Sequence, residues 1–172
     1  AFEWYLKAAE LGDADAQNYV GVLYDTGRGV PEDDRLAVDW YRKSAQQGHW
    51  WGAKNLGGMY AAGTGIAKDE AEAVKWYRIA AERGLAEAQN ALGLMYDAGR
   101  GVPLDDVEGN RWYQRAADQG MAAAIYNLAY NAAAGEGCPQ DLPRAHTLFR
   151  QAAAKDHVLS MYRLARMHDE GE

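Results

Sequence analysis

Hydrophobic and small side chains recur along this chain with the spacing of one face of an α-helix. In residues 13–26, Ala16, Val20, Leu23 and Tyr24 follow an i, i+4, i+7, i+8 pattern. This spacing is typical of an amphipathic helix that buries one face against neighbouring elements. The pattern therefore predicts a first helix over residues 13–26.

A second helical pattern follows after a short break. Residues 27–31 read Gly-Arg-Gly-Val-Pro, and glycine favours a left-handed helix end while proline cannot continue the helix. Beyond the break, Ala37, Trp40, Tyr41 and Ser44 stand at i, i+3, i+4, i+7. The sequence predicts two antiparallel helices joined by a glycine-rich turn.

This helix pair repeats at intervals of 36 residues. The aromatic pair Trp-Tyr marks the interval, at Trp4-Tyr5, Trp40-Tyr41, Trp76-Tyr77 and Trp112-Tyr113, and Leu148-Phe149 continues it. A fixed period of this length is the signature of a stacked repeat array. We therefore predict an all-α fold, an α/α solenoid with a right-handed superhelix and about ten helices.

The domain organisation follows from the period. We predict one array over residues 1–172, without a globular domain beside it. Its parts are the second helix of a truncated repeat (1–12), full repeats at 13–48, 49–84, 85–120 and 121–156, and the first helix of a truncated repeat (157–172).

Recurring polar residues and glycines refine the expected helix ends and contacts. An aspartate precedes each second helix, at Asp33, Asp69, Asp105 and Asp141, where its side chain can cap the helix. Glu72 and Glu108 have the spacing of a capping box. Gly21, Gly57 and Gly93 recur in the middle of first helices, where we expect two helix backbones to approach closely.

The repeat resembles a known family. It reads Ala-x-x-x-Leu-Gly-x-x-Tyr-x-x-Gly-x-Gly-Val-x-x-Asp, then Trp-Tyr-x-x-Ala-Ala-x-x-Gly, and it runs from Ala88 to Gly120, with Gly109 where other repeats have Ala. This pattern is similar to the Sel-one-like repeat family, relatives of the tetratricopeptide repeat. The resemblance covers essentially the whole chain. It implies a scaffold or adaptor that binds other proteins, often in bacteria. The paired cysteines of one family branch are absent here, so the features of that branch are not expected.

Composition narrows the classes of function. The net charge of −7 disfavours nucleic-acid binding, which needs clustered basic residues. No apolar run reaches the ~18 residues that a membrane span requires, so we expect no membrane insertion. Cys138 is the single cysteine and allows no intrachain disulfide. The chain begins within a repeat at Ala1, and the sequence leaves bacterial cytoplasm and periplasm or secretion as alternatives.

The residues that could carry chemistry form no catalytic or metal-binding set. Cys138 stands where other repeats have Val or Ile, so we interpret it as a small core residue. The histidines lack the spacing of metal ligands, and we interpret them as surface polar residues: His49, His146, His157 and His168. We therefore predict a non-enzymatic protein without cofactor or metal.

A binding site is predicted from positions that vary between repeats. Constant positions serve stacking, so variable positions are free to serve a ligand. In the first helices the variable stripe lies away from the core stripe, and in tetratricopeptide-like arrays this face lines the concave groove. The predicted partner-binding residues are Asn18, Val22, Trp51, Lys54, Asn55, Asn90, Leu94, Tyr126, Asn127, Tyr130, Tyr162, Arg163 and Arg166.

Two aromatic clusters depart most from the repeat. Trp50 and Trp51 occupy positions that other repeats fill with small or acidic residues, and tryptophan is a favoured interface anchor. Trp51 is a predicted groove residue and Trp50 a secondary anchor, although Trp50 could instead pack on the preceding second helix. The second cluster consists of Tyr126, Tyr130 and Tyr162 with Arg163 and Arg166. Its tyrosines could instead fill the space left by Ala132, which replaces a core tyrosine of the earlier repeats; this alternative suits Tyr130 better than Tyr126.

The sequence thus favours a protein-interaction scaffold whose concave groove holds a peptide or a partner's helix. The alternative is a glycan- or peptidoglycan-binding module, because exposed aromatic rings also stack on sugars. Within the groove, acidic residues lie toward the N-terminal half and Arg163 and Arg166 toward the C-terminal end. We expect an apolar partner side chain against Trp51 and Leu94 and an acidic end toward the arginines.

Overall fold

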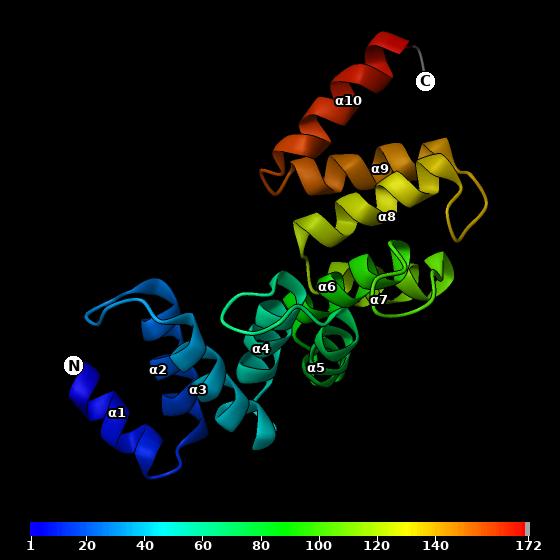
Figure 1. Ribbon diagram of the computed structural model, residues 1–172. Helices are drawn as coiled ribbons and strands as arrows, with labels where there is room; N and C mark the ends of the chain where they lie inside the picture. The colour runs from blue at the N-terminus through cyan, green and yellow to red at the C-terminus, as the bar shows by residue number, and fades with distance from the viewer. Residues whose placement is uncertain (171–172) are drawn as a thin grey trace. The chain divides into compact units, whose positions relative to one another are not determined.

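The computed structural model describes residues 1–170 and contains ten α-helices and no strand in that range (Figure 1). The all-α repeat fold predicted from the sequence is confirmed. The helices are α1 Phe2–Glu10, α2 Ala14–Thr26, α3 Asp34–Gln46, α4 Trp50–Ala62, α5 Glu70–Glu82, α6 Ala86–Asp97, α7 Asp106–Asp118, α8 Ala122–Ala134, α9 Leu142–Ala153 and α10 Val158–Glu170.

Side-chain caps define where the helices begin. Asp33 accepts a hydrogen bond from the backbone N–H of Leu36 at 3.0 Å, and the same bond recurs at the start of α5, α7 and α9. The predicted aspartate caps are therefore confirmed. The two glutamates at capping-box positions form ion pairs within their own helices: Glu72 pairs with Lys75, and Glu108 pairs with Arg111.

Glycines in the left-handed conformation end the first helices. Gly27, Gly63 and Gly135 follow α2, α4 and α8 with φ of 63°, 76° and 81°. Each is the first glycine of a Gly-x-Gly turn. These positive φ values are accessible to glycine at little cost, which explains why the turn recurs with the repeat.

The mid-helix glycines make room for tyrosine rings. A Cβ at Gly21 would lie 2.6 Å from a ring carbon of Tyr41, and a Cβ at Gly93 would lie 2.5 Å from a ring carbon of Tyr113. The sequence had suggested a close approach of two helix backbones. Backbones also approach closely, since a Cβ at Gly57 would lie 3.2 Å from the carbonyl oxygen of Ala73 and a Cβ at Gly109 would lie 3.2 Å from that of Gly93. The structure adds that the nearest atoms belong to the tyrosine ring of the paired second helix.

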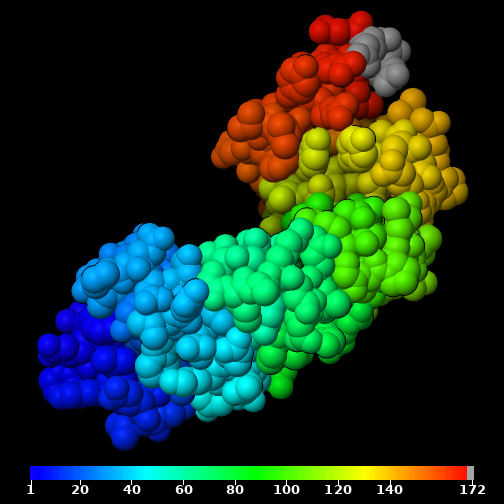
Figure 2. Space-filling view, in the orientation of Figure 1, coloured from blue at the N-terminus to red at the C-terminus, as the bar shows by residue number. Residues whose placement is uncertain are grey.

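The chain forms two units, Ala1–Ala88 and Gln89–Glu172, and the boundary falls within α6. In the first unit, successive helices pack from α1 through α5, and segments coloured dark blue through cyan lie directly against one another (Figure 2). Its apolar core includes Trp40 packed with Ala9 and Ala16. A large ring thus packs over small alanines of the neighbouring helices in this unit.

The second unit has its own core between α8, α9 and α10. Phe149 lies there with Ala129, Ala145 and Met167. Cys138 packs partly buried against this cluster, with its Sγ 3.8 Å from the carbonyl oxygen of Asn131. Its predicted role as a small hydrophobic core residue is confirmed.

Candidate functional site

The predicted binding residues lie on the first helices of the two units, and each unit is considered separately. We call this the first-helix surface. In the first unit it comprises residues of α2 and α4; in the second it comprises residues of α6, α8 and α10.

An asparagine pair links neighbouring first helices in the first unit. The Asn55 side-chain amide donates to the Asn18 side-chain oxygen at 3.0 Å, and Lys54 Nζ donates to Asn55 Oδ1 at 3.3 Å. All three side chains are half-buried. These bonds fix the orientation of both amides and leave the Asn18 NH₂ group available as a donor.

The same pair recurs two repeats later. In the second unit, Asn127 donates to the Asn90 side-chain oxygen at 2.9 Å. Here the Asn90 NH₂ group and the Asn127 oxygen are available as donor and acceptor. The structure therefore brings together four predicted residues as two equivalent pairs.

An aromatic hollow of about 510 Å³ lies beside Asn18 of the first pair. Tyr5, Tyr19, Trp51, Asp15 and His49 contribute to its lining. The rings of Tyr5 and Tyr19 are 4.3 Å apart between centroids. Trp51 remains 39% exposed, so much of its ring can contact a ligand. Sequence reasoning missed Tyr5, because it stands at the constant tyrosine position of the Trp-Tyr pair, whereas Tyr19 stands at a variable position at the edge of the predicted stripe.

His49 organises this hollow. Its Nδ1 accepts from the backbone N–H of Gly52 at 3.1 Å, which caps α4. With Nδ1 an acceptor, Nε2 carries the proton in neutral histidine, and it contacts Asp15 Oδ1 at 2.8 Å. The sequence had suggested a surface polar residue; the structure shows a helix cap with a mostly buried ring.

Trp50 lies beside His49 and outside the hollow. Its ring stacks on the imidazole with centroids 6.0 Å apart and an interplanar angle of 12°, yet it is 43% exposed. Both interpretations of Trp50 stay predictions, because His49 is the cap of α4 itself and lies outside the preceding second helix α3.

The aromatic residues of the second unit divide into packed and exposed. Tyr126 lies against Phe149 and His157, with centroid distances of 5.7 and 4.9 Å. Tyr130 is 40% exposed, and the guanidinium carbon of Arg163 lies 5.3 Å from its ring centroid. The packing alternative therefore suits Tyr126 better than Tyr130, the reverse of the sequence-based expectation. Tyr162 is well exposed on α10.

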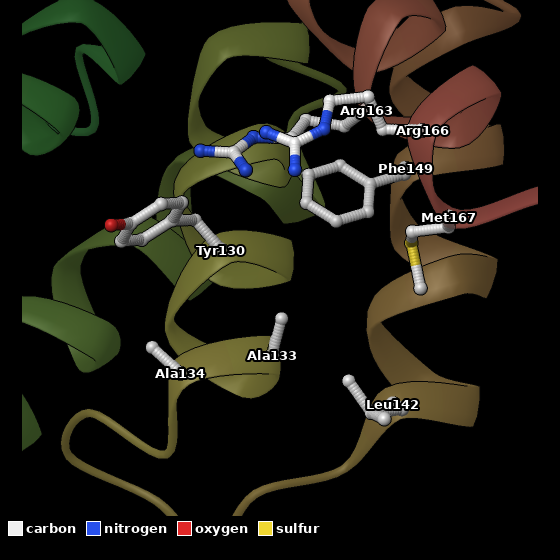
Figure 3. A pocket seen from close by; sticks show the side chains of 8 residues that line it. All are labelled: Tyr130, Ala133, Ala134, Leu142, Phe149, Arg163, Arg166 and Met167. Atoms are coloured by element: carbon white, nitrogen blue, oxygen red, sulfur yellow. The ribbon is translucent and has the colours of Figure 1, made fainter. Parts of the chain in front are cut away.

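Arg163 and Arg166 stand at a recess of about 220 Å³ between α8, α9 and α10 (Figure 3). Its apolar lining includes Ala133, Phe149 and Met167, which sequence reasoning missed. A signal was present: this repeat has Ala133 and Phe149 where the repeat 36 residues earlier has Asp97 and Tyr113. Together the two replacements remove a carboxylate and a hydroxyl from the same place between the helices, which would have predicted an unfilled space there.

In the first and third full repeats, a partly buried Tyr–Asp hydrogen bond fills this position. Tyr41 donates to Asp25 at 2.9 Å, and Tyr113 donates to Asp97 at 2.8 Å. Burial first, and the neighbouring carboxylate second, raise the pKa of both tyrosines. Both hydroxyls therefore remain protonated donors throughout the physiological range.

Asp97 has a distinctive environment. Burial raises its pKa, and hydrogen bonds from Tyr113 and Asn131 oppose that shift. Its Oδ1 is buried without a hydrogen-bond partner. A Cβ at Gly109 would lie 2.3 Å from this oxygen, so the replacement of the usual alanine by glycine makes room for the carboxylate.

Among the side chains of residues 1–169, no group of three or more His, Cys, Asp or Glu could hold a metal ion. Among the described helices, none is long and apolar enough to cross a membrane. The fold and its first-helix surfaces define the class as an α/α helical-repeat protein.

The chain belongs to the Sel1 repeat family. The family matches residues 1–13, 14–49, 52–85, 86–121, 122–157 and 158–172. Sel1 repeat proteins generally mediate protein–protein interactions and are generally not enzymes.

Solved structures support this membership. The chain is 37% identical to c5321, a protective antigen of uropathogenic Escherichia coli with an SLR fold, with a TM-score of 0.94; the match covers 98% of this chain and 36% of the antigen. It is 36% identical to a Sel1 repeat protein from Oxalobacter formigenes, with a TM-score of 0.92, covering 99% and 68%. The immunity protein Pa5087 from Pseudomonas aeruginosa is 27% identical, with a TM-score of 0.57, covering 88% and 56%.

The chain thus spans about a third of the E. coli antigen's length. A search of curated proteins finds no match.

Proposed function

We propose that this chain is a non-enzymatic scaffold that binds extended segments of partner proteins on the first-helix surface of each unit. The supporting observation is the recurring asparagine pair. Each pair is held by an internal hydrogen bond of 2.9–3.0 Å. Each also presents amide groups that are free to bond with a ligand.

The chemistry of these pairs suits a peptide backbone. An extended peptide carries one donor and one acceptor in every residue, and a side-chain amide can bond with both. Fixing the amides beforehand reduces the entropy lost on binding. The neighbouring Trp51 and Leu94 in the first and second units, each about 40% exposed, can receive apolar side chains of the peptide.

A binding titration with a purified partner tests the proposal. The partner is isolated on the immobilised chain and identified by mass spectrometry. Asn18→Ala and Asn90→Ala are then compared with Arg42→Ala on α3, a second helix. We expect at least one asparagine variant to weaken binding about fivefold or more, the loss of a hydrogen bond worth about 1 kcal/mol. Equal weakening by Arg42→Ala would contradict the first-helix surface as the binding face.

A glycan is the second candidate, favoured by the aromatic hollow of the first unit. Tyr5, Tyr19 and Trp51 offer rings for stacking, and Asp15 offers a carboxylate for hydroxyl groups. Peptidoglycan fragments serve as the probe. Binding that depends on Trp51 and Tyr19 but is unaffected by Asn90→Ala would support the glycan in place of the peptide.

A further inference from the structure

The recess between α8, α9 and α10 is an exception within the repeat pattern. In the first and third full repeats, the corresponding space holds a tyrosine hydroxyl bonded to an aspartate: Tyr41 with Asp25 and Tyr113 with Asp97. In the fourth repeat both groups are missing, because Ala133 lacks the carboxylate and Phe149 lacks the hydroxyl. A recess of about 220 Å³ remains.

The interior of the recess is suited to an apolar group. Phe149 and Met167 are almost fully buried, and Ala133, Ala134 and Leu142 complete the apolar lining. An engineered apolar cavity of about 150 Å³ is large enough to bind benzene. The volume here therefore accommodates a side chain the size of leucine, methionine or phenylalanine.

The mouth of the recess is cationic. Arg163 and Arg166 are three residues apart on α10, so they share a face of that helix, and Figure 3 shows both guanidinium groups reaching over the recess toward Tyr130. Among the residues whose side chains the structure describes, those that line the recess include no acidic one, although the chain carries a net charge of −7. The corresponding positions of α8 are Asn127 and Tyr130, so the two arginines are not required by the repeat.

We infer that this recess is a specificity pocket for a partner segment in which a large apolar side chain stands next to a carboxylate. The apolar side chain enters between Phe149 and Met167, and the carboxylate pairs with Arg163 and Arg166. Arginine can hold a carboxylate through two parallel hydrogen bonds, which neutral groups reproduce poorly. This inference rests on the proposed scaffold function and names the partner chemistry at one of its sites.

Defined peptides test the inference directly. The probe is the blocked hexapeptide acetyl-Gly-Ser-Leu-Glu-Gly-Ser-amide, together with its methionine and phenylalanine counterparts. Matched controls carry Gln in place of Glu, or Ala in place of the large apolar residue. Affinity is measured by NMR titration of the whole chain, and the methyl resonance of Met167 reports on the recess. We expect at least about tenfold weaker binding of both controls. Equal affinity for the Glu and Gln peptides would overturn the inference.

Two variants separate the two parts of the pocket. Ala133→Asp combined with Phe149→Tyr introduces the Tyr–Asp pair that Tyr41 and Asp25 form in the first repeat. The two sites are comparable, because Met59 has the same repeat position there as Met167 has at the recess. This filled variant should fold, and its affinity for the Glu peptide should be at least about tenfold lower than that of the unchanged protein. Arg163→Gln combined with Arg166→Gln should abolish the preference for Glu over Gln. Unchanged binding by a folded filled variant, or an unchanged preference in the arginine variant, would overturn the inference.

A matched control comes from the first unit. Asp25→Ala combined with Tyr41→Phe removes the hydrogen-bonded carboxylate and hydroxyl from the first repeat. At the repeat positions of Arg163 and Arg166, this site has the uncharged residues Asn55 and Gly58. This variant should leave the affinity for the Glu peptide unchanged; tighter binding would show that any unfilled repeat suffices and would overturn the inference.

Two further outcomes distinguish this inference from the proposed function. A partner whose binding depends on Asn90 but is indifferent to the filled recess would preserve the scaffold function and overturn the pocket. A concentration-dependent dimer that the filled variant abolishes would identify the occupant as a second copy of the chain and would likewise overturn it.

Discussion

At the scale of single residues, exposure separates the tryptophans of the repeat register from the tryptophan that departs from it. Trp40 is 9% exposed and belongs to the core of the first unit, whereas Trp51 is 39% exposed on the first-helix surface. Trp76, which the sequence places in the same register as Trp40, is only half-buried. Register therefore predicts which face a ring occupies, while neighbouring helices decide how completely it is covered.

Trp40→Ala should lower the free energy of unfolding by about 3–5 kcal/mol, because it leaves a cavity in the core. Trp51→Ala should cost well under half as much, since its side chain is 39% exposed and belongs to neither apolar core cluster described above. Urea denaturation of both variants measures the difference. Equal losses would place Trp51 in the core and remove its support as a binding residue.

Gly93→Ala should destabilise the protein by about 1–3 kcal/mol, as expected for overpacking, although alanine is the better helix former by about 1 kcal/mol. The new Cβ would lie 2.5 Å from the Tyr113 ring. Gly58→Ala is the matched control, because its Cβ would meet only the Tyr77 hydroxyl at 3.6 Å. Stabilisation of similar size by both changes would show that the ring moves aside freely.

At the scale of elements, the Asp97–Tyr113 contact joins α6 to α7 within the second unit. Burial raises the pKa of Asp97, and the negative charges of Asp106 and Glu136 raise it further. A raised folded-state pKa means that the folded protein binds this proton more tightly than the unfolded chain. The resulting stabilisation is fully present below the unfolded-state pKa and is lost as the pH rises through the folded-state pKa.

Asp97→Asn, which stays neutral, should therefore gain stability relative to the unchanged protein as the pH rises from 3 to 7. Urea denaturation at a series of pH values provides the measurement. Asp118→Asn, an exposed position at the end of α7, controls for the change in net charge. A stability difference that stays constant over this range, or falls, would contradict the assignment of burial as the dominant influence on Asp97.

At the scale of the whole molecule, the repeat produces two units, each with its own core and asparagine pair. Membership of the Sel1 repeat family agrees with this construction. Because Sel1 repeat proteins generally mediate protein–protein interactions, we expect interaction to be the chain's activity.

The purified chain should show a far-ultraviolet circular dichroism spectrum of an almost wholly helical protein and no hydrolytic, transfer or redox turnover. Substrate panels for these reaction classes provide the second measurement. Turnover that copurifies with the chain and disappears in Cys138→Ala or His146→Ala would contradict the scaffold function, because a contaminating enzyme would be insensitive to these changes.

The sequence by itself determined the helices, their caps and the repeat. Amphipathic spacing, glycine-rich turns and capping aspartates depend on local geometry, and the 36-residue recurrence of Trp-Tyr establishes the stacking pattern without knowledge of distant contacts. The alternation between constant and variable positions also identified the first helices as the candidate binding face. It placed both members of each asparagine pair on that face.

The tertiary structure decided which side chains meet. Asn18 and Asn55 are far apart in sequence, and only the packing of α2 beside α4 brings their amides within 3.0 Å. The structure also showed that the mid-helix glycines make room for tyrosine rings and that the ring of Tyr126 packs against Phe149 and His157. The recess beneath Arg163 depends on the space between three helices. Such volumes arise from the sum of side-chain sizes across elements, which a one-dimensional pattern does not contain.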